Sequence, residues 1–106
     1  MRHRRTSHSI PAETREMALC RRARTWRRRG EHRRAMLALR EAAHFCEDDA
    51  RLWALYGAQC ARMGRLGEAR EALVHAAWLR ERRQEHEKAR TTRAFVARLD
   101  ASATLA

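Results

Sequence analysis

The chain has 106 residues, enough for one small domain and too few for a cofactor domain beside a substrate domain. It carries 24 lysine and arginine residues against 13 aspartate and glutamate residues, a formal charge of +11, yet 44% of its residues are hydrophobic. This composition excludes a disordered basic tail, and no apolar run approaches the roughly 18 residues of a membrane span. Residues 1–9 are basic and no apolar stretch follows them, so we expect no secretory signal and a cytoplasmic location.

Apolar residues recur at helical spacing, and the alternating patterns typical of strands do not occur. The sequence therefore predicts an all-α fold of about five helices. The apolar positions of these helices fall, in chain order, within residues 17–26, 35–45, 52–60, 66–79 and 94–99. Gly30 and Gly64 end the first and third helices, and the acidic stretch 47–49 supplies an N-cap for the third. We expect residues 1–9 to form a disordered basic arm and residues 101–106 a disordered tail.

The charge lies almost entirely at the N-terminal end. Residues 1–40 carry 13 arginines against three glutamates, whereas residues 41–106 carry 11 basic and 10 acidic groups. Two interpretations stay open: an arginine-rich face that only contacts solvent, or a surface that attracts an acidic partner through forces that salt would weaken.

No pattern typical of an active site occurs. Three cysteines at spacings of 26 and 14 residues fit neither a disulfide framework nor a zinc site, and the six histidines are scattered. We therefore expect no catalytic residues, no metal and no cofactor, and cysteines that serve as small buried residues. Cys20 is the one cysteine for which we consider a lowered pKa, because Arg24 is predicted to lie beside it.

An internal repeat is the strongest signal. Shifting the sequence by 34 residues aligns large residues with large ones, small with small, and a glycine with a glycine at the turn between two helices. A helix–turn–helix period of 34 residues is typical of helical solenoids. The aligned pairs are Leu19 with Trp53, Ala23 with Gly57, Trp26 with Cys60, Gly30 with Gly64, Ala35 with Ala69, Leu39 with Leu73, Ala42 with Ala76, and Phe45 with Leu79.

The second copy resembles a tetratricopeptide repeat. It has the tryptophan of that family at Trp53, the large residue and glycine at Tyr56 and Gly57, and the alternation of small and large residues in its second helix. It departs from the family at Cys60, where an aromatic residue is usual, and at Glu81, where a proline is usual. The first copy is a weaker match.

This resemblance implies a right-handed α-solenoid of antiparallel helix pairs. Within a helical domain of residues 10–100, the repeats would span 16–49 and 50–83. A capping helix at 84–100 would begin a third unit in register and cover the second repeat with Phe95, Val96 and Leu99. We expect Trp26, Trp53, Tyr56 and Phe45 to belong to the core, and Trp78 to be partly exposed.

The family's members generally bind a segment of another protein in a groove lined by the first helix of each pair. By resemblance, the chain is a non-enzymatic adaptor or scaffold whose groove is rimmed by arginine and takes an acidic or amphipathic segment of a partner protein. Two alternatives stay open: binding of nucleic acid or another polyanion through the first 40 residues, and self-association into a homodimer or structural subunit. The implied groove residues are Met17, Cys20, Arg24, Arg27, Arg28, Arg51, Ala54, Ala58, Ala61 and Arg62.

Overall fold

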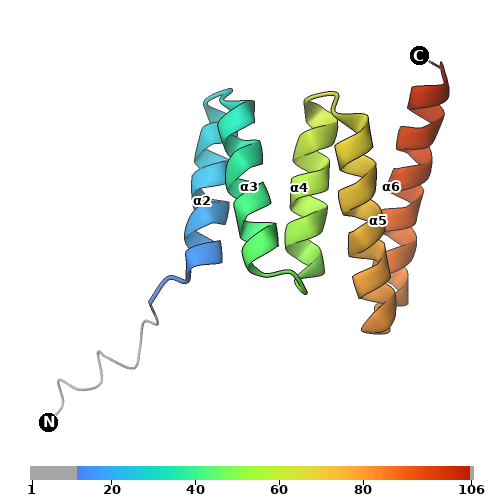
Figure 1. Ribbon diagram of the computed structural model, residues 1–106, viewed down its shortest axis with the longest axis horizontal. Helices are drawn as coiled ribbons and strands as arrows, with labels where there is room; N and C mark the ends of the chain where they lie inside the picture. Colours follow the sequence, from blue (N-terminus) through green and yellow to red (C-terminus); the bar gives the residue numbers. More distant parts are fainter. Residues whose placement is uncertain (1–11, 106) are drawn as a thin grey trace, which may run out of the picture.

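The computed structural model describes residues 12–105, which form five helices and no strand. The helices are α2 (Arg15–Arg28), α3 (His32–Phe45), α4 (Ala50–Arg62), α5 (Leu66–Arg82) and α6 (His86–Leu105). They stand side by side in chain order, with successive helices running in opposite directions (Figure 1), and each packs chiefly on its neighbours in the sequence. The predicted all-α class is confirmed for this part of the chain. The basic arm expected at residues 1–9 lies outside it.

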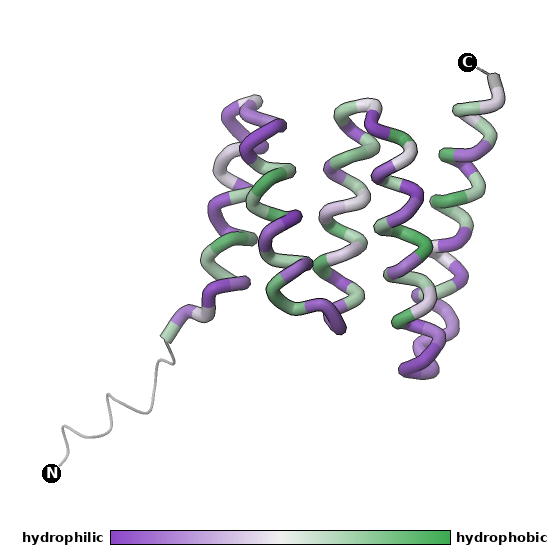
Figure 2. Tube along the Cα trace, viewed as in Figure 1, coloured by the Kyte–Doolittle hydropathy of each residue, from purple (hydrophilic) through white to green (hydrophobic). Residues whose placement is uncertain are grey.

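The core between the helices is built largely from small side chains. Ala35, Ala42, Ala69 and Ala76 have no exposed surface, and among the large side chains Met36, Leu52 and Leu73 are almost completely buried. Alanine at the contacts lets helices approach closely, and each fully buried large side chain contributes about 1.5–3 kcal/mol to folding. Hydrophilic residues gather at the turns, most densely where α5 meets α6 (Figure 2).

Helices α4 and α5 approach each other closely at Gly57 of α4. A Cβ atom placed on this glycine would lie 2.8 Å from Leu73 Cγ and 3.2 Å from the carbonyl oxygen of Ala69, both on α5. Contacts of 2.8 Å are shorter than carbon atoms tolerate, so only glycine fits without movement of α5. Ala23, 34 residues earlier, is also buried, although it carries a Cβ atom.

Three of the four turns share one geometry. In each, a residue with positive φ follows the helix: 78° at Gly30, 75° at Gly64 and 62° at Gln84. The next backbone N–H donates to the carbonyl oxygen five residues earlier, over 2.8–2.9 Å, which is the Schellman arrangement that ends many helices. The glycines at the first two turns meet the requirement for positive φ at no steric cost, whereas Gln84 meets it with a side chain.

The turn from α3 to α4 is different. The Asp49 carboxylate caps α4 by accepting hydrogen bonds from the backbone N–H groups of Arg51 and Leu52, at 3.0 and 3.3 Å. The Trp53 indole Nε1 donates to the carbonyl oxygen of Glu47 over 2.9 Å, which ties the first turn of α4 to the turn itself. The N-cap predicted from the acidic stretch is therefore confirmed.

The last helix departs from the predicted boundaries. We expected a cap in register at residues 84–100, but α5 continues three residues past the 34-residue copy of α3, so α6 begins at His86. We also expected residues 101–106 to be disordered, whereas α6 continues to Leu105. Alanines at 101 and 103 favour a helix, and the Thr104 hydroxyl donates to the Asp100 carbonyl oxygen. Residue 106 lies outside the described part.

Side-chain contacts fix α6 on α5. Val96 and Leu99 are buried, and Phe95 is partly buried against the core. Arg80 Nη1 donates to the hydroxyl of the buried Thr92 over 2.7 Å, and Arg70 Nε donates to Asp100 over 2.9 Å. Polar bonds therefore reinforce the apolar contact at two heights along the helix pair.

Of the four aromatic residues expected in the core, Tyr56 is buried, Trp26 and Trp53 pack against the core but stay partly exposed, and Phe45 is not in the core. Phe45 is 58% exposed, although its counterpart Leu79 is buried. The difference follows from where the helices end: α3 stops at Phe45, whereas α5 continues past Leu79 and leads directly into α6. The Arg15 guanidinium covers the Phe45 ring instead, 5.0 Å from its centroid.

Candidate interaction surfaces

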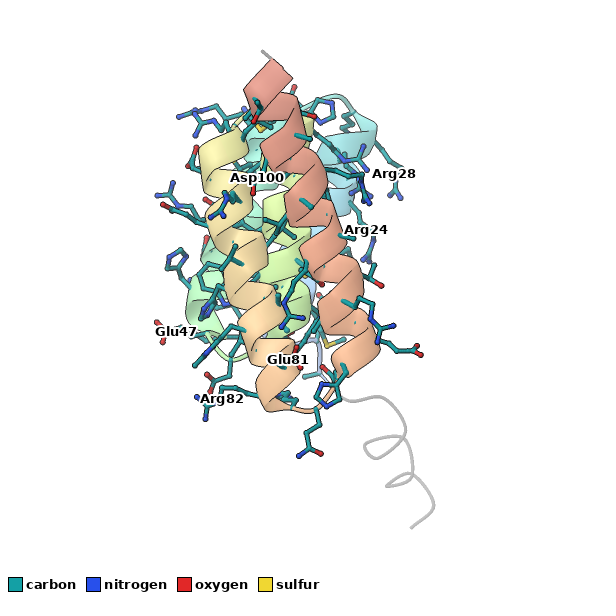
Figure 3. The ribbon with its side chains drawn as sticks, turned by 90° about the vertical axis from the view of Figure 1, so that its right-hand side faces the viewer. Arg24, Arg28, Glu47, Glu81, Arg82 and Asp100 are labelled. Carbon is teal, nitrogen blue, oxygen red and sulfur yellow. The ribbon has the colours of Figure 1, made fainter. Side chains whose placement is uncertain are left out.

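Charged side chains project from both sides of the row of helices. Viewed from the α6 end, Arg24 and Arg28 lie on one side, and Glu47 and Arg82 lie on the other (Figure 3). Arginines recur at helical spacing along α2, arginines and alanines recur along α4, and Arg24 of α2 and Arg51 of α4 line one cleft. We call this surface the arginine face, formed by Arg24, Arg27, Arg28, Arg51, Ala54, Ala58, Ala61 and Arg62.

A cleft of about 240 Å³ lies between α2 and the start of α4. It brings together four of the ten predicted groove residues: Met17, Cys20, Arg24 and Arg51. Carboxylates of Glu13, Glu16 and Asp49 also line this cleft, so its wall is mixed in charge. The remaining six predicted groove residues lie farther along α2 and α4, outside this cleft; Arg28 and Arg62 are exposed, and the three alanines and Arg27 are partly exposed.

The thiol of Cys20 is not activated. Cys20 is only 6% exposed, and its burial raises the pKa of the thiol more than the positive charges of Arg51 and Arg24 lower it. The lowered pKa that we considered from the sequence is therefore wrong, because desolvation outweighs the charge of the neighbouring arginines. Burial likewise raises the pKa of Cys60. These two cysteines serve as small core residues.

The arginines of the arginine face have no carboxylate partners within residues 12–104. Ion pairs elsewhere use other arginines: Arg21 Nε lies 2.9 Å from Glu13 and lowers the pKa of that carboxyl, and Arg65 pairs with Glu68 at 3.0 Å. Arg24, Arg27, Arg28, Arg51 and Arg62 are among the arginines that make no such contact in this part of the chain. Their guanidinium groups are free to pair with acidic groups of another molecule.

The other side of the molecule carries a furrow that the sequence analysis missed. It lies between α3 and α5, has a volume of about 730 Å³, and has Trp53 and Tyr56 of α4 among its lining residues. Six residues of α5 line it, and four of them follow one helical stripe at spacings of three and four: Glu68, Glu71, His75 and Trp78, with Ala72 and Leu79 beside this stripe. This stripe of acidic and aromatic residues is the signal in the sequence that could have revealed the furrow.

The structure brings no metal site together. Within the described residues, no group of three histidine, cysteine or acidic side chains lies close enough to hold a metal ion. Over the same part of the chain, none of the helices has both the length and the apolar character that crossing a membrane requires.

Comparison with known proteins identifies no relative. No model of a known protein family matches the sequence, and no curated protein is significantly similar to it. Function is therefore inferred from the two surfaces themselves.

Proposed function

We propose that the chain is a tetratricopeptide-like solenoid that binds an acidic or amphipathic segment of a partner protein along its arginine face and catalyses no reaction. The proposed solenoid is supported by the helix pairs α2–α3 and α4–α5, whose turns at Gly30 and Gly64 have matching φ angles of 78° and 75°. It is also supported by Ala35 and Ala69, which occupy the same place after these turns and are both completely buried. In this arrangement α2, α4 and α6 would line the inner curve.

The binding proposal rests on one observation: the five arginines of the arginine face follow one helical stripe of α2 and one of α4 and have no ion-pair partner among the described residues. Arginine pairs with carboxylates through two parallel hydrogen bonds, which gives it both strength and orientation. The side chains between them on α4, at Ala54, Ala58 and Ala61, are small and partly exposed, so a helix or extended chain could approach the backbone. Each exposed ion pair is worth about 0.2–1 kcal/mol, so several must act together.

The test uses charge reversal on the full-length chain. The Arg24→Glu, Arg27→Glu and Arg62→Glu triple variant is titrated with a fluorescent amphipathic peptide of glutamate and leucine, and folding is checked by circular dichroism. Loss of three ion pairs should weaken binding about 3- to 100-fold. The matched control reverses Arg22, Arg33 and Arg90, which are exposed arginines outside the arginine face, and should stay within about threefold of the unsubstituted chain.

Two results would contradict the proposal. Equal loss in both triple variants would mean that net charge alone attracts the peptide. If the peptide fails to bind while short random DNA binds with a steep dependence on salt, the alternative of polyanion binding would be correct.

A further inference from the structure

We propose that the furrow between α3 and α5 is a second binding site, which takes an arginine-containing segment of a partner polypeptide. This site lies on the face opposite the arginine face and has the opposite charge, so it does not depend on the function proposed above. Three observations support it: the charge of the furrow, the position of Trp53, and the way in which this molecule pairs arginine with aromatic rings.

The furrow is negatively charged in a strongly basic chain. Its lining has four carboxylates, from Glu47, Asp48, Glu68 and Glu71, against the guanidinium of Arg40, and Arg82 lies over the ring of the lining residue Trp78. Of the four, only Glu68 has an ion-pair partner in residues 12–104, which is Arg65 at 3.0 Å. Glu47 lies on the outer surface, away from Arg24 and Arg28 (Figure 3). A cationic segment is therefore the ligand that complements this surface in charge.

An indole ring held in place lies among these carboxylates. Trp53 is partly exposed, and its Nε1 donates to the Glu47 carbonyl oxygen over 2.9 Å. The rings of His44 and His75 meet it edge to face, with centroids 5.1 and 4.9 Å away. The ring is thus fixed from three sides before any ligand arrives, which lowers the entropic cost of binding.

Arginine covers the other partly exposed or exposed aromatic rings of this molecule. Guanidinium groups lie over the rings of Trp26, Phe45, Trp78 and Phe95, at 4.8–5.9 Å from the centroids. Trp53 has no such arginine among the described residues, although it lies beside three carboxylates without ion-pair partners. A guanidinium from a partner could stack on the ring and pair with a carboxylate at once, because its plane and its fork serve both contacts. A lysine ammonium is also attracted to an indole face, but it lacks the planar fork that stacks on the ring and pairs bidentately with a carboxylate.

The experiment follows the three indole N–H signals of the ¹⁵N-labelled full-length chain, assigned with Trp→Phe variants. The probe is a synthetic twelve-residue peptide with four arginines among glycine and serine. We expect it to shift the Trp53 signal and to leave the Trp26 signal unchanged, with affinity that falls as salt is added. The same peptide with lysine should bind more weakly, and with neutral citrulline it should not bind.

Substitution of the unpaired carboxylates tests the site directly. The double variant Glu47→Gln and Glu71→Gln should bind the arginine peptide about 2- to 30-fold more weakly, since two exposed ion pairs are removed. The control variant Glu31→Gln and Glu87→Gln changes the net charge equally at carboxylates outside the furrow and should stay within about twofold. Because the substitutions lie away from α2, binding of the acidic peptide to the arginine face should be unaffected.

Three outcomes would overturn the proposal. If the citrulline peptide shifts Trp53 as strongly as the arginine peptide does, the furrow does not select for charge. If both double variants weaken binding of the arginine peptide equally, the peptide is attracted only by the net charge of the chain and not by the carboxylates of the furrow. A shift at Trp26 with none at Trp53 would place the peptide on another surface.

Discussion

Replacing Gly57 by alanine tests the close contact between α4 and α5. The added Cβ atom would lie 2.8 Å from Leu73 Cγ, and overpacking of this kind costs about 1–3 kcal/mol. Alanine in place of glycine inside a helix recovers up to about 1 kcal/mol. The expected net result is a free energy of unfolding lower by about 0–2 kcal/mol, and the two contributions can be separated with a control at another helical glycine.

Gly67→Ala provides that control, because a Cβ atom at Gly67 in α5 would meet nothing within 4 Å. It should raise the free energy of unfolding by up to about 1 kcal/mol, so the two alanine variants should differ by about 1–3 kcal/mol. Urea unfolding followed by circular dichroism at 222 nm measures both values.

The reverse substitution Ala23→Gly, at the corresponding place in α2, should destabilise the chain by about 1 kcal/mol or more. It removes a buried methyl group and a good helix former together. If Gly57→Ala stabilises the chain as much as Gly67→Ala does, α4 and α5 do not approach as closely as described, and the packing argument fails.

Gln84 has a φ of 62°, a conformation that strains any residue with a side chain, so Gln84→Gly should raise the free energy of unfolding by about 1 kcal/mol in urea titrations. Gly64→Gln should lower it by a similar amount. If Gln84→Gly brings no gain in stability, the shared turn geometry is contradicted. Burial raises the pKa of Tyr56, the one tyrosine of the chain, to about 12. The Tyr56 hydroxyl, followed by absorbance at 295 nm, should therefore titrate near pH 12 in the folded chain and near pH 10 in urea. The free energy of unfolding should fall as the pH rises above about 10, because the unfolded chain loses this proton first. A midpoint near 10 in chain that is still helical would refute that burial.

Local features of this fold could be predicted from the sequence. Gly30 and Gly64 end helices because the left-handed conformation at their turns costs glycine little. An N-cap within residues 47–49 could be predicted because a side-chain oxygen just before a helix can accept from its first N–H groups; the structure shows that Asp49 is the cap. Small residues recur at the same positions of the 34-residue repeat, among them Ala35, Gly57 and Ala69. This pattern indicated that the paired helices cross closely there.

The ends of the last helix and the exposure of Phe45 could not be predicted in this way. A 34-residue shift applied to α3 and α4 places the end of α5 and the start of α6 too early, because α5 extends by almost one turn. Phe45 and Leu79 occupy the same place in the repeat, yet Leu79, near the end of α5, is buried and Phe45, at the end of α3, is exposed. Burial at the end of a helix depends on the path of the next element, which a repeat pattern does not contain.

By itself, the sequence determined the helices, two of their turns and the uneven distribution of charge, because each depends on residues within a few positions of one another. Only the tertiary structure decided which charges face each other across helices. Arg40, Trp53 and His75 come from three different helices and meet in one furrow, while burial raises the pKa of Cys20 and Tyr56. Electric fields and desolvation act through space, so the chemistry of both surfaces depends on how the helices pack.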